Sequence, residues 1–259
     1  MTEIDTVICV AQRAGRLLFE NILQPHQISY KGVIDMVTEM DRASERLIME
    51  VLKNEYPEYG FLGEEGTHLD EVSKGRWIVD PVDGTTNYSR GYPIFAVSIA
   101  LEKSSQVVLG VVYNPALDEL FVAEKGQGAT LNGQPIHVSQ TAELGKSLLA
   151  SGFPYDVWSS PVNNFREWSE FMRRTISVRC DGAASLDLCH VAMGRVDGYW
   201  ELDLEPWDMA AGALIVQEAG GTVSLVSGQP FALPGRNILA SNGNLHQAML
   251  GVLNNHYLE

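Results

Sequence analysis

The stretch WIVDPVDGTTNY, residues 77–88, combines a short apolar strand, two carboxylates and a turn. Residues 77–79 are apolar and predict a buried strand that ends at Asp80. Asp83 follows three positions later, which is close enough for both carboxylates to face the same cations. Asp-Gly is also a common turn dipeptide, and Asp83-Gly84 alone would favour a simple hairpin. The whole stretch is longer than a turn requires, so it predicts a metal site beside a buried strand.

Further carboxylates occur at distant positions in the chain. Glu64 and Glu65 form an acidic pair in a predicted loop, and Asp208 follows Trp207 in the first turn of a predicted helix. Taken alone, the pair is typical of a solvated loop, and Asp208 is typical of an acid that complements a helix dipole. Mg²⁺ prefers hard oxygen ligands, so a site needs carboxylates from several segments. Together these acids therefore indicate a divalent-cation site.

Two other features have both a structural and a functional interpretation. Thr38 and Asp41 match a capping box, in which Thr38 caps a helix and Asp41 is its third residue. Capping and catalysis are equally well supported by this local sequence. Thr85 and Thr86, beside Gly84, either open a helix whose N–H groups bind phosphate or cap a helix without any ligand. Both alternatives stay open at this point.

The composition indicates a globular protein with an acidic surface. The chain has 259 residues, of which 45% are hydrophobic and 20% charged, which is ordinary for a folded domain with a substantial core. Its formal net charge of −15 argues against a nucleic-acid-binding surface, since phosphate backbones require clustered Lys and Arg. Bound Mg²⁺ would reverse the sign of the local field and allow an acidic protein to bind phosphate.

Cysteine usage and apolar patterning favour a cytoplasmic protein. Cys9, Cys180 and Cys189 form no CxxC pair and no disulfide framework, which is typical of reduced thiols. The N-terminus lacks the basic region and long apolar core of a signal peptide. The longest apolar run, residues 94–101, suits a buried strand, so we expect no membrane partner.

Several other catalytic motifs are incomplete. The Gly126-Gln127-Gly128 segment lacks a third glycine, and Gln140 stands where a P-loop ending at Lys146-Ser147 requires glycine. The chain has no GxSxG elbow, and its six histidines lack zinc-ligand spacing. Metal-assisted hydrolysis of a phosphoester is therefore the favoured chemistry.

Hydrophobic periodicity divides the chain into two halves that form one continuous unit, with a soft boundary near residue 145. Residues 1–145 predict an α+β half that carries the metal-binding motifs, with an Asn132-Gly133 hairpin and a largely antiparallel sheet. Its expected helices cover about 4–21 and 38–54, and its expected strands cover 77–79, 94–101, 107–112, 119–123 and 136–138.

Residues 146–259 predict an α/β half that completes the active site. Pro206 is expected to open a helix and Gly194 to follow the end of another. The expected helices cover 161–174, 184–193, 206–219 and about 244–253, and the expected strands cover 148–151, 176–179, 198–201, 222–226 and 237–241.

The motifs closely resemble those of the inositol monophosphatase family, within the lithium-sensitive Mg²⁺-dependent phosphatase superfamily. The match covers nearly the whole chain, and its motifs stand in the family's order and spacing. They are Asp35-Met36-Val37-Thr38 with Asp41, Gly63-Glu64-Glu65, DPVDGTTNY at 80–88, Trp207-Asp208-Met209-Ala210-Ala211-Gly212, and Glu218-Ala219-Gly220-Gly221.

This resemblance implies a layered α-β-α-β-α sandwich of the sugar phosphatase type, usually a homodimer, with two or three Mg²⁺ ions at each site. It implies that the metal ligands are Glu64, Asp80, the Val82 carbonyl, Asp83 and Asp208. It further implies catalytic roles in orienting and activating water for Asp41, Glu64 and Thr85. The implied substrate-binding residues are Gly84, Thr85 and Thr86 for the phosphate, with Gly182, Ala183, Ala184, Glu201 and Asp208 toward the polyol.

Two residues depart from the family pattern on the expected sugar side. Asp181 precedes Gly182 where relatives commonly carry a small or hydroxyl residue, and Glu205 precedes Pro206 where bacterial relatives often have a basic residue. Acids at these positions would repel a second phosphate, which favours monophosphates.

The expected function is that of a Mg²⁺-dependent phosphomonoesterase acting on inositol 1-phosphate or a related polyol or sugar phosphate. Rivals with the same chemistry are fructose 1,6-bisphosphatase, histidinol phosphatase and adenosine 3′,5′-bisphosphate phosphatase. The continuation Thr86-Asn87-Tyr88 resembles the inositol branch. Alternatives from other classes are a regulatory binding protein that retains the fold and a passive cation-binding protein.

Overall fold

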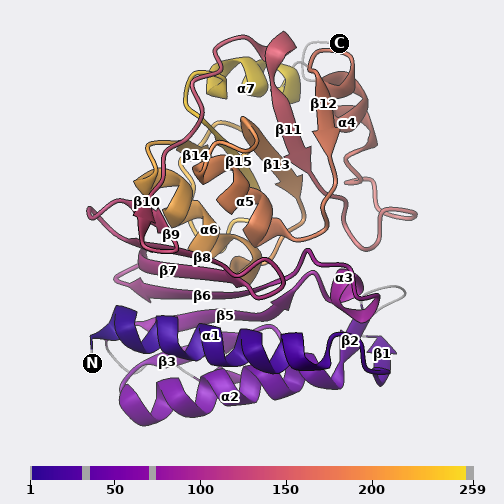
Figure 1. Cartoon of the computed structure of the whole chain (residues 1–259). Coiled ribbons are helices and arrows are strands. Elements are labelled where there is room, and N and C mark those ends of the chain that lie inside the picture. Colours follow the sequence, from indigo (N-terminus) through magenta and orange to yellow (C-terminus); the bar gives the residue numbers. More distant parts are fainter. Residues whose placement is uncertain (1, 31–35, 70–73, 255–259) are drawn as a thin grey trace.

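Two β-sheets alternate with three layers of helices in this computed structural model, which describes residues 2–30, 36–69 and 74–254 (Figure 1). The first outer layer contains α1 (Glu3–Asn21) and α2 (Glu39–Glu55), the central layer contains α5 (Ala184–Ala192) and α6 (Pro206–Glu218), and the second outer layer contains α4 (Phe165–Met172) and α7 (His246–Asn254). This arrangement confirms the predicted α-β-α-β-α sandwich.

The larger sheet lies between the α1–α2 layer and the central helices. Its eight strands are antiparallel to their neighbours except where β3 pairs in parallel with β5. In spatial order they are β10 (Gln134–Pro135), β9 (Ala129–Leu131), β8 (Glu119–Glu124), β7 (Gln106–Asn114), β6 (Ala96–Lys103), β5 (Arg76–Asp83), β3 (Gly60–Gly63) and β4 (His68–Leu69).

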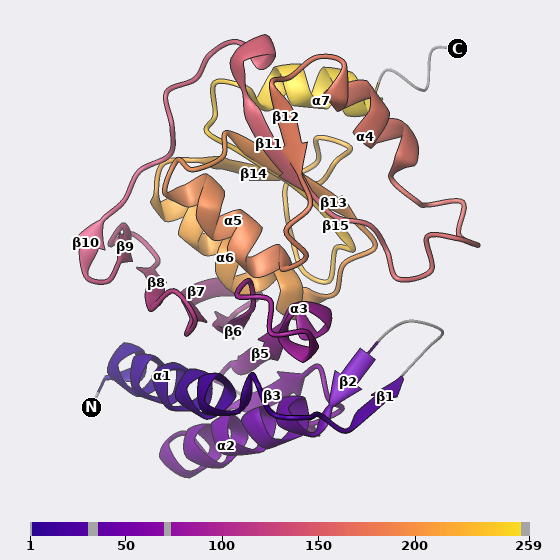
Figure 2. The same ribbon diagram turned by 45° about the vertical axis from the view of Figure 1, so that its right-hand side comes forward.

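The smaller sheet lies between the central helices and the α4–α7 layer (Figure 2). Here β11 runs parallel to both β12 and β13, whereas β15 runs antiparallel to β13 and β14. In spatial order its strands are β12 (Ser177–Arg179), β11 (Leu148–Ser151), β13 (Gly198–Leu202), β15 (Asn237–Ser241) and β14 (Thr222–Ser224). The remaining elements are a ribbon of β1 (Ile28–Tyr30) and β2 (Met36–Thr38), the short helix α3 (Thr85–Ser89) and a 3₁₀ turn at Leu144–Lys146.

The central helices are apolar on nearly all sides because a sheet covers each face. Every residue of α5 is buried, and α6 buries most of its length. One continuous core joins Ile78 of the larger sheet to Tyr199 and Ile238 of the smaller one through these helices. None of the helices in the described ranges is both long and apolar enough to span a membrane. The domain boundary near residue 145 stays a prediction.

Two of the predicted elements were wrong in extent, and one predicted strand does not form. The strand predicted at 77–79 continues to Asp83, so Asp80 lies within a buried strand, and the pairing of β5 with β6 shifts register between Asp80 and Asp83. Residues 136–138 form no strand, because the Val138 N–H donates to the Ala219 carbonyl at the end of α6 instead of to a neighbouring strand.

The helix predicted from residue 161 begins only at Phe165. Asn164 has a φ of 62°, which a right-handed helix does not accept. Its side chain also donates to the Gly152 carbonyl at 2.6 Å and accepts from the Trp200 indole at 2.7 Å. Asn164 therefore fixes the preceding chain in an irregular path. Asp35, the first residue of the motif that continues through Thr38, lies outside the described ranges.

The close approach of α6 to β7 can be tested at a glycine. A Cβ atom on Gly110 would lie 2.8 Å from the Ala211 carbonyl oxygen and 3.0 Å from the Ala211 Cα, both of which are backbone atoms. We expect Gly110→Ala to lower the free energy of unfolding by about 1–3 kcal/mol in urea denaturation, because the helix must move away from the sheet.

Gly251→Ala in α7 is the matched control for this substitution. No described atom lies within 4 Å of the Cβ that it adds, so we expect a change between zero and a stabilisation of about 1 kcal/mol. If Gly110→Ala were as stable as the control, the inferred backbone contact between α6 and β7 would be wrong.

Candidate functional site

The acidic residues of the distant motifs converge on one cleft because of the strand order. β3 and β5 are parallel neighbours, and the Glu64 N–H donates to the Val79 carbonyl at 3.2 Å, so Glu64 follows β3 directly beside Asp80. Asp208 reaches the same place from the first turn of α6. The cleft has a volume of about 430 Å³, and its lining includes Glu64, Asp80, Val82, Asp83, Gly84, Thr85 and Asp208. The structure thus brings all five predicted metal ligands together.

Asp83 is held by the N-terminal end of α5. Its carboxylate accepts hydrogen bonds from the Ala184 N–H at 3.2 Å, the Ser185 N–H at 2.8 Å and the Ser185 hydroxyl at 2.5 Å. The positive end of the helix dipole stabilises a carboxylate in this position. Burial nevertheless outweighs these hydrogen bonds and raises the pKa of Asp83 to about 6.

Asp80 and Asp208 repel one another and their acidic neighbours. Asp80 accepts one hydrogen bond from the Val82 N–H at 3.0 Å, and Asp208 accepts one from the Glu205 N–H at 2.8 Å. Burial and the charges of Glu64, Asp83 and Asp208 raise the pKa of Asp80 well above its ordinary value. Burial also raises the pKa of Asp208. This all-oxygen set of crowded carboxylates suits hard divalent cations such as Mg²⁺, which would offset the repulsion.

Asp41 performs the capping role and also reaches the site. The Thr38 N–H and hydroxyl donate to Asp41 Oδ2 at 2.9 and 2.5 Å, which confirms the capping box. Its other oxygen, Oδ1, accepts from the Thr85 hydroxyl at 2.7 Å. Asp41 is fully buried and does not line the cleft, whereas Thr85 does. The two interpretations of Asp41 are therefore compatible, and its contact with the cleft passes through Thr85.

The turn at Gly84 requires glycine and connects the carboxylate cleft to the loop at residues 181–184. Gly84 has a φ of +88°, and a Cβ there would lie 3.0 Å from the Ile94 carbonyl oxygen and 3.1 Å from that of Gly182. Asn87 of α3 donates to the carbonyls of Ile94 and Asp181, each at 2.8 Å. Figure 2 shows α3 next to the N-terminal end of α5, where residues 181–184 lie. Main-chain contacts thus fix the position of this loop.

The remaining predicted substrate residues line a second cleft that continues from the first. It has a volume of about 420 Å³ and shares Asp83, Gly84 and Asp208 with the carboxylate cleft. Thr86, Gly182, Ala183, Ala184 and Glu201 also line it. The Tyr199 hydroxyl donates to Glu201 at 2.5 Å, and burial raises the pKa of Glu201 to about 7. A carboxyl group that titrates near neutrality therefore lies one cleft away from the crowded acids.

Sequence reasoning missed Arg236, which lines the mouth of the carboxylate cleft. Arg236 donates to Asp203 at 2.7 Å and also pairs with Glu205. It lies in a loop before β15, where no motif marks it. The acid at Glu205 is consequently paired with a cation, so its repulsion of a second phosphate is weaker than the sequence alone indicates.

Comparisons with known proteins give one consistent result. The model of the inositol monophosphatase family matches residues 1–257. An inositol-1-monophosphatase of Synechocystis is 46% identical over 249 residues, which are 95% of this chain and 86% of that protein. The Nus factor SuhB of Pseudomonas aeruginosa is 40% identical over 263 residues, covering 98% of this chain and 96% of that protein.

A solved structure shows the same relationship. The inositol monophosphatase of Anabaena (Nostoc) superposes with a TM-score of 0.88 at 40% identity, covering 96% of this chain and 94% of that chain. The match therefore includes both sheets and all three helix layers. With the family model spanning almost every residue, this chain belongs to the inositol monophosphatase family.

Proposed function

We propose that this protein is a Mg²⁺-dependent phosphomonoesterase that hydrolyses inositol 1-phosphate or a closely related small polyol phosphate. The observation that carries the proposal is the convergence of Glu64, Asp80, Asp83 and Asp208 on the cleft that contains the Gly84 turn. Membership of the family, and the name of the Synechocystis relative, support the phosphatase chemistry and the choice of substrate. As the resemblance implies, we propose a lithium-sensitive homodimer, and the cysteine usage leads us to propose that it is cytoplasmic.

The proposed ligands of two or three Mg²⁺ ions are the carboxylates of Glu64, Asp80, Asp83 and Asp208 and the Val82 carbonyl. When bound, Mg²⁺ supplies an activated water and offsets the charge of the phosphoryl group. The protein fixes the ligands through separate backbone contacts, since Asp80 accepts from Val82, Asp83 from α5 and Asp208 from Glu205. These contacts leave carboxylate lone pairs free to coordinate a cation.

Thr85 and Asp41 are placed to orient the attacking water. The Thr85 hydroxyl has one proton, for which Asp41 Oδ1 at 2.7 Å and the Val82 carbonyl at 3.0 Å are the acceptors, so its oxygen is left to accept a hydrogen bond from water in the cleft. Asp41 holds this hydroxyl in one orientation and is available to accept its proton. Glu64, beside Asp80, is proposed to act on a water in the same cleft.

The substrate is proposed to lie across the two connected clefts. The main-chain N–H groups of Gly84, Thr85 and Thr86, at the start of α3, are proposed to bind the phosphate. Gly182, Ala183 and Ala184 provide a narrow wall of small side chains, and Glu201 is able to accept hydrogen bonds from polyol hydroxyls. Asp208 lines both clefts, so it is placed between the metal side and the polyol side.

A second candidate function is that of a regulatory binding protein. The similarity to a protein named Nus factor SuhB supports it, since a relative with this name covers nearly the whole chain. The net charge of −15 disfavours direct RNA binding. The complete set of carboxylates favours retained catalysis, because a pure binding role does not require four crowded acids that repel each other.

Phosphate release from a substrate panel tests the proposal. The panel contains inositol 1-phosphate, fructose 1,6-bisphosphate, histidinol phosphate and adenosine 3′,5′-bisphosphate, each with Mg²⁺, with EDTA, and with Mg²⁺ plus Li⁺. We expect turnover that requires Mg²⁺, is inhibited by Li⁺ and is fastest on inositol 1-phosphate. Preference for another member would move the substrate assignment, and no release from any member would favour the regulatory binding protein.

The substitution Asp80→Asn tests the metal assignment. We expect kcat to fall by about 10³-fold or more, because the central carboxylate ligand is lost. The melting temperature of Asp80→Asn in EDTA should be higher than that of the wild type, since one charge of the repelling group is removed. The increase in melting temperature on adding Mg²⁺ should be smaller than in the wild type. Glu143→Gln, an exposed acid far from the cleft, is the control and should behave as the wild type. Near-normal turnover of Asp80→Asn would refute the assignment.

The raised pKa values predict how stability depends on pH when metal is absent. Asp83 and Glu201 have folded-state pKa values of about 6 and about 7, above their ordinary values of 3.8 and 4.5. Between about pH 4 and 7 the folded state therefore retains protons that the unfolded chain has lost. The stability that these two carboxyl groups contribute is fully present below their ordinary pKa values and is lost as the pH rises to about 7.

In EDTA, we expect the melting temperature measured by calorimetry to fall by several degrees between pH 5 and pH 8. Mg²⁺ added at pH 8 should reverse this decrease, because it binds the ionised carboxylates. Glu201→Gln should reduce the pH dependence and keep the Mg²⁺ effect. A melting temperature in EDTA that is constant or increases over this range would contradict the expected sign.

A further inference from the structure

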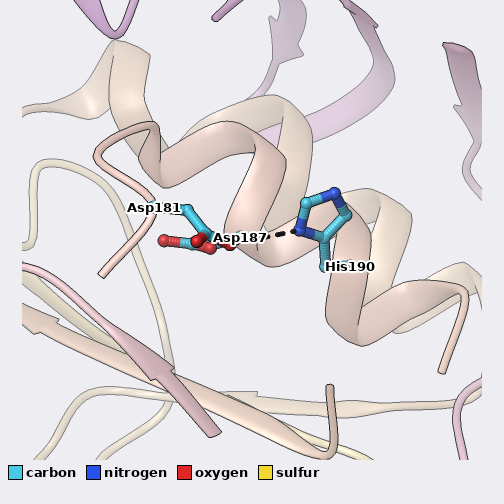
Figure 3. Close-up of side chains that lie close together, drawn as sticks. All are labelled: Asp181, Asp187 and His190. Atoms are coloured by element: carbon cyan, nitrogen blue, oxygen red, sulfur yellow. Dashed lines mark ion pairs between the residues drawn. The ribbon is translucent and has the colours of Figure 1, made fainter. Parts of the chain in front are cut away.

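A second group of potential ligands lies behind the substrate loop, on α5. Asp187 and His190 are three residues apart on this helix and so share one face, and Asp181 faces them from the loop that precedes it (Figure 3). His190 Nδ1 is 3.9 Å from an Asp181 carboxylate oxygen. One ligand atom from each residue lies within 4.8 Å of the other two. Among the described residues, this is the one group of three or more His, Cys, Asp or Glu whose ligand atoms all lie within 4.8 Å of one another.

Asp187 is the most deeply buried residue of this group and has one oxygen without a hydrogen-bond partner among the described residues. Its side chain is 1% exposed, and this oxygen is Oδ1. Burial raises the pKa of Asp187 well above its ordinary value, and the charges of Asp181, Glu201 and Asp83 raise it further. Within residues 2–30, 36–69 and 74–254, no Lys or Arg forms an ion pair with this carboxylate in the way Arg236 pairs with Asp203. A buried carboxylate oxygen without a partner is costly, so the position favours a cationic ligand.

His190 adds a nitrogen donor that is suited to a metal. The residue is buried, and burial together with the charge of Arg195 lowers its pKa. The imidazole is therefore neutral at pH 7 and has a lone pair available. A metal with bonds of about 2.0–2.2 Å places its ligand atoms about 3.3–3.5 Å apart, so shifts of roughly 1 Å would close the group around one ion.

An approach path exists from the substrate side. The Asp181 side chain is 27% exposed and lines the polyol cleft, whereas Asp187 and His190 lie deeper. An ion that enters through the cleft would therefore meet Asp181 first. Asn87 anchors the main chain of this loop through the Asp181 carbonyl at 2.8 Å, while the Asp181 carboxylate faces His190 on α5.

We infer that Asp181, Asp187 and His190 form a second cation site that binds a transition-metal dication such as Zn²⁺. This site is separate from the carboxylate cleft. One imidazole and two carboxylates form a mixed nitrogen and oxygen donor set, which Zn²⁺ and Co²⁺ accept more readily than Mg²⁺ does. The bound ion connects the loop at 181–184 to α5. The bound ion thereby stabilises the wall of the second cleft, in which residues 182–184 lie. Binding of this ion does not depend on the proposed phosphatase reaction.

Isothermal titration with Zn²⁺ in excess Mg²⁺ tests the site on the full-length protein. Mg²⁺ occupies the all-oxygen cleft, and Asp80→Asn removes a ligand there without touching the second group. We expect one equivalent of Zn²⁺ to bind to the wild type and to Asp80→Asn alike. His190→Gln and Asp181→Asn should each weaken this binding by at least about tenfold. His137→Gln, at an exposed histidine, is the matched control and should not change it.

Co²⁺ provides an independent spectroscopic readout of the same site. In excess Mg²⁺, the wild type should show Co²⁺ absorption bands that His190→Gln lacks and His137→Gln retains. Asp181→Asn protects the test against misfolding, because this side chain is partly exposed. If the wild type binds no Zn²⁺, or if His190→Gln and Asp181→Asn bind it as tightly as the wild type, the inference is overturned. The two aspartates would then be a carboxyl pair that shares one proton.

Discussion

The concentration of buried carboxylates at one junction is the constraint on which most of this structure depends. Four acids face a single cleft, and burial together with their mutual repulsion raises the pKa of Asp80 well above its ordinary value. The fold offsets this repulsion with the N-terminal ends of three helices. Asp41 and Asp208 are third residues of α2 and α6, and Asp83 accepts two N–H groups at the start of α5. Each end contributes positive dipole charge where acids accumulate.

This use of helix ends explains why the central layer is so apolar. The N-terminal ends of α5 and α6 reach the cleft only because both helices run between the two sheets, and that position buries them on all sides. α5 has no exposed residue, and a single core cluster joins both sheets through α5 and α6. The close contact of Gly110 with Ala211 belongs to the same packing. Stability and the placement of the acids thus depend on the same pair of helices.

Local chemistry explains which parts of the fold could be predicted. Helices α2 and α6 were located from a capping box and from Pro206 at the first position, signals that act within one turn. Six short strands were missed, because two to four residues are too few to show a period of two; they are β1, β2, β3, β4, β9 and β10. The strand predicted at 136–138 failed for another reason, since Val138 finds its partner at Ala219, which no local pattern reveals.

In the candidate site too, residues marked by local sequence motifs were predicted and residues placed by distant contacts were not. Residues in contiguous motifs, such as Asp80, Asp83 and Thr85, were identified because several of their features are adjacent in the chain. Arg236 was missed because its partners, Asp203 and Glu205, are about thirty residues away and become adjacent only through the pairing of β13 with β15. Sequence reasoning did not single out His190, since the histidines lack zinc-ligand spacing. Its neighbour in space, Asp181, comes from a loop outside the helix.

Helix α5 contacts both the acids of the carboxylate cleft and the group of Asp181, Asp187 and His190. Its first turn holds Asp83 through Ser185 and also carries Asp187, which lies beside Asp181. The charges of Asp83 and Glu201 raise the pKa of Asp187, so the two groups interact across this short distance. A cation bound in either group lowers the cost of ionising the other. An acidic protein that binds a phosphate ester therefore gains if positive charge is present on both sides of the substrate cleft, not only at the phosphate.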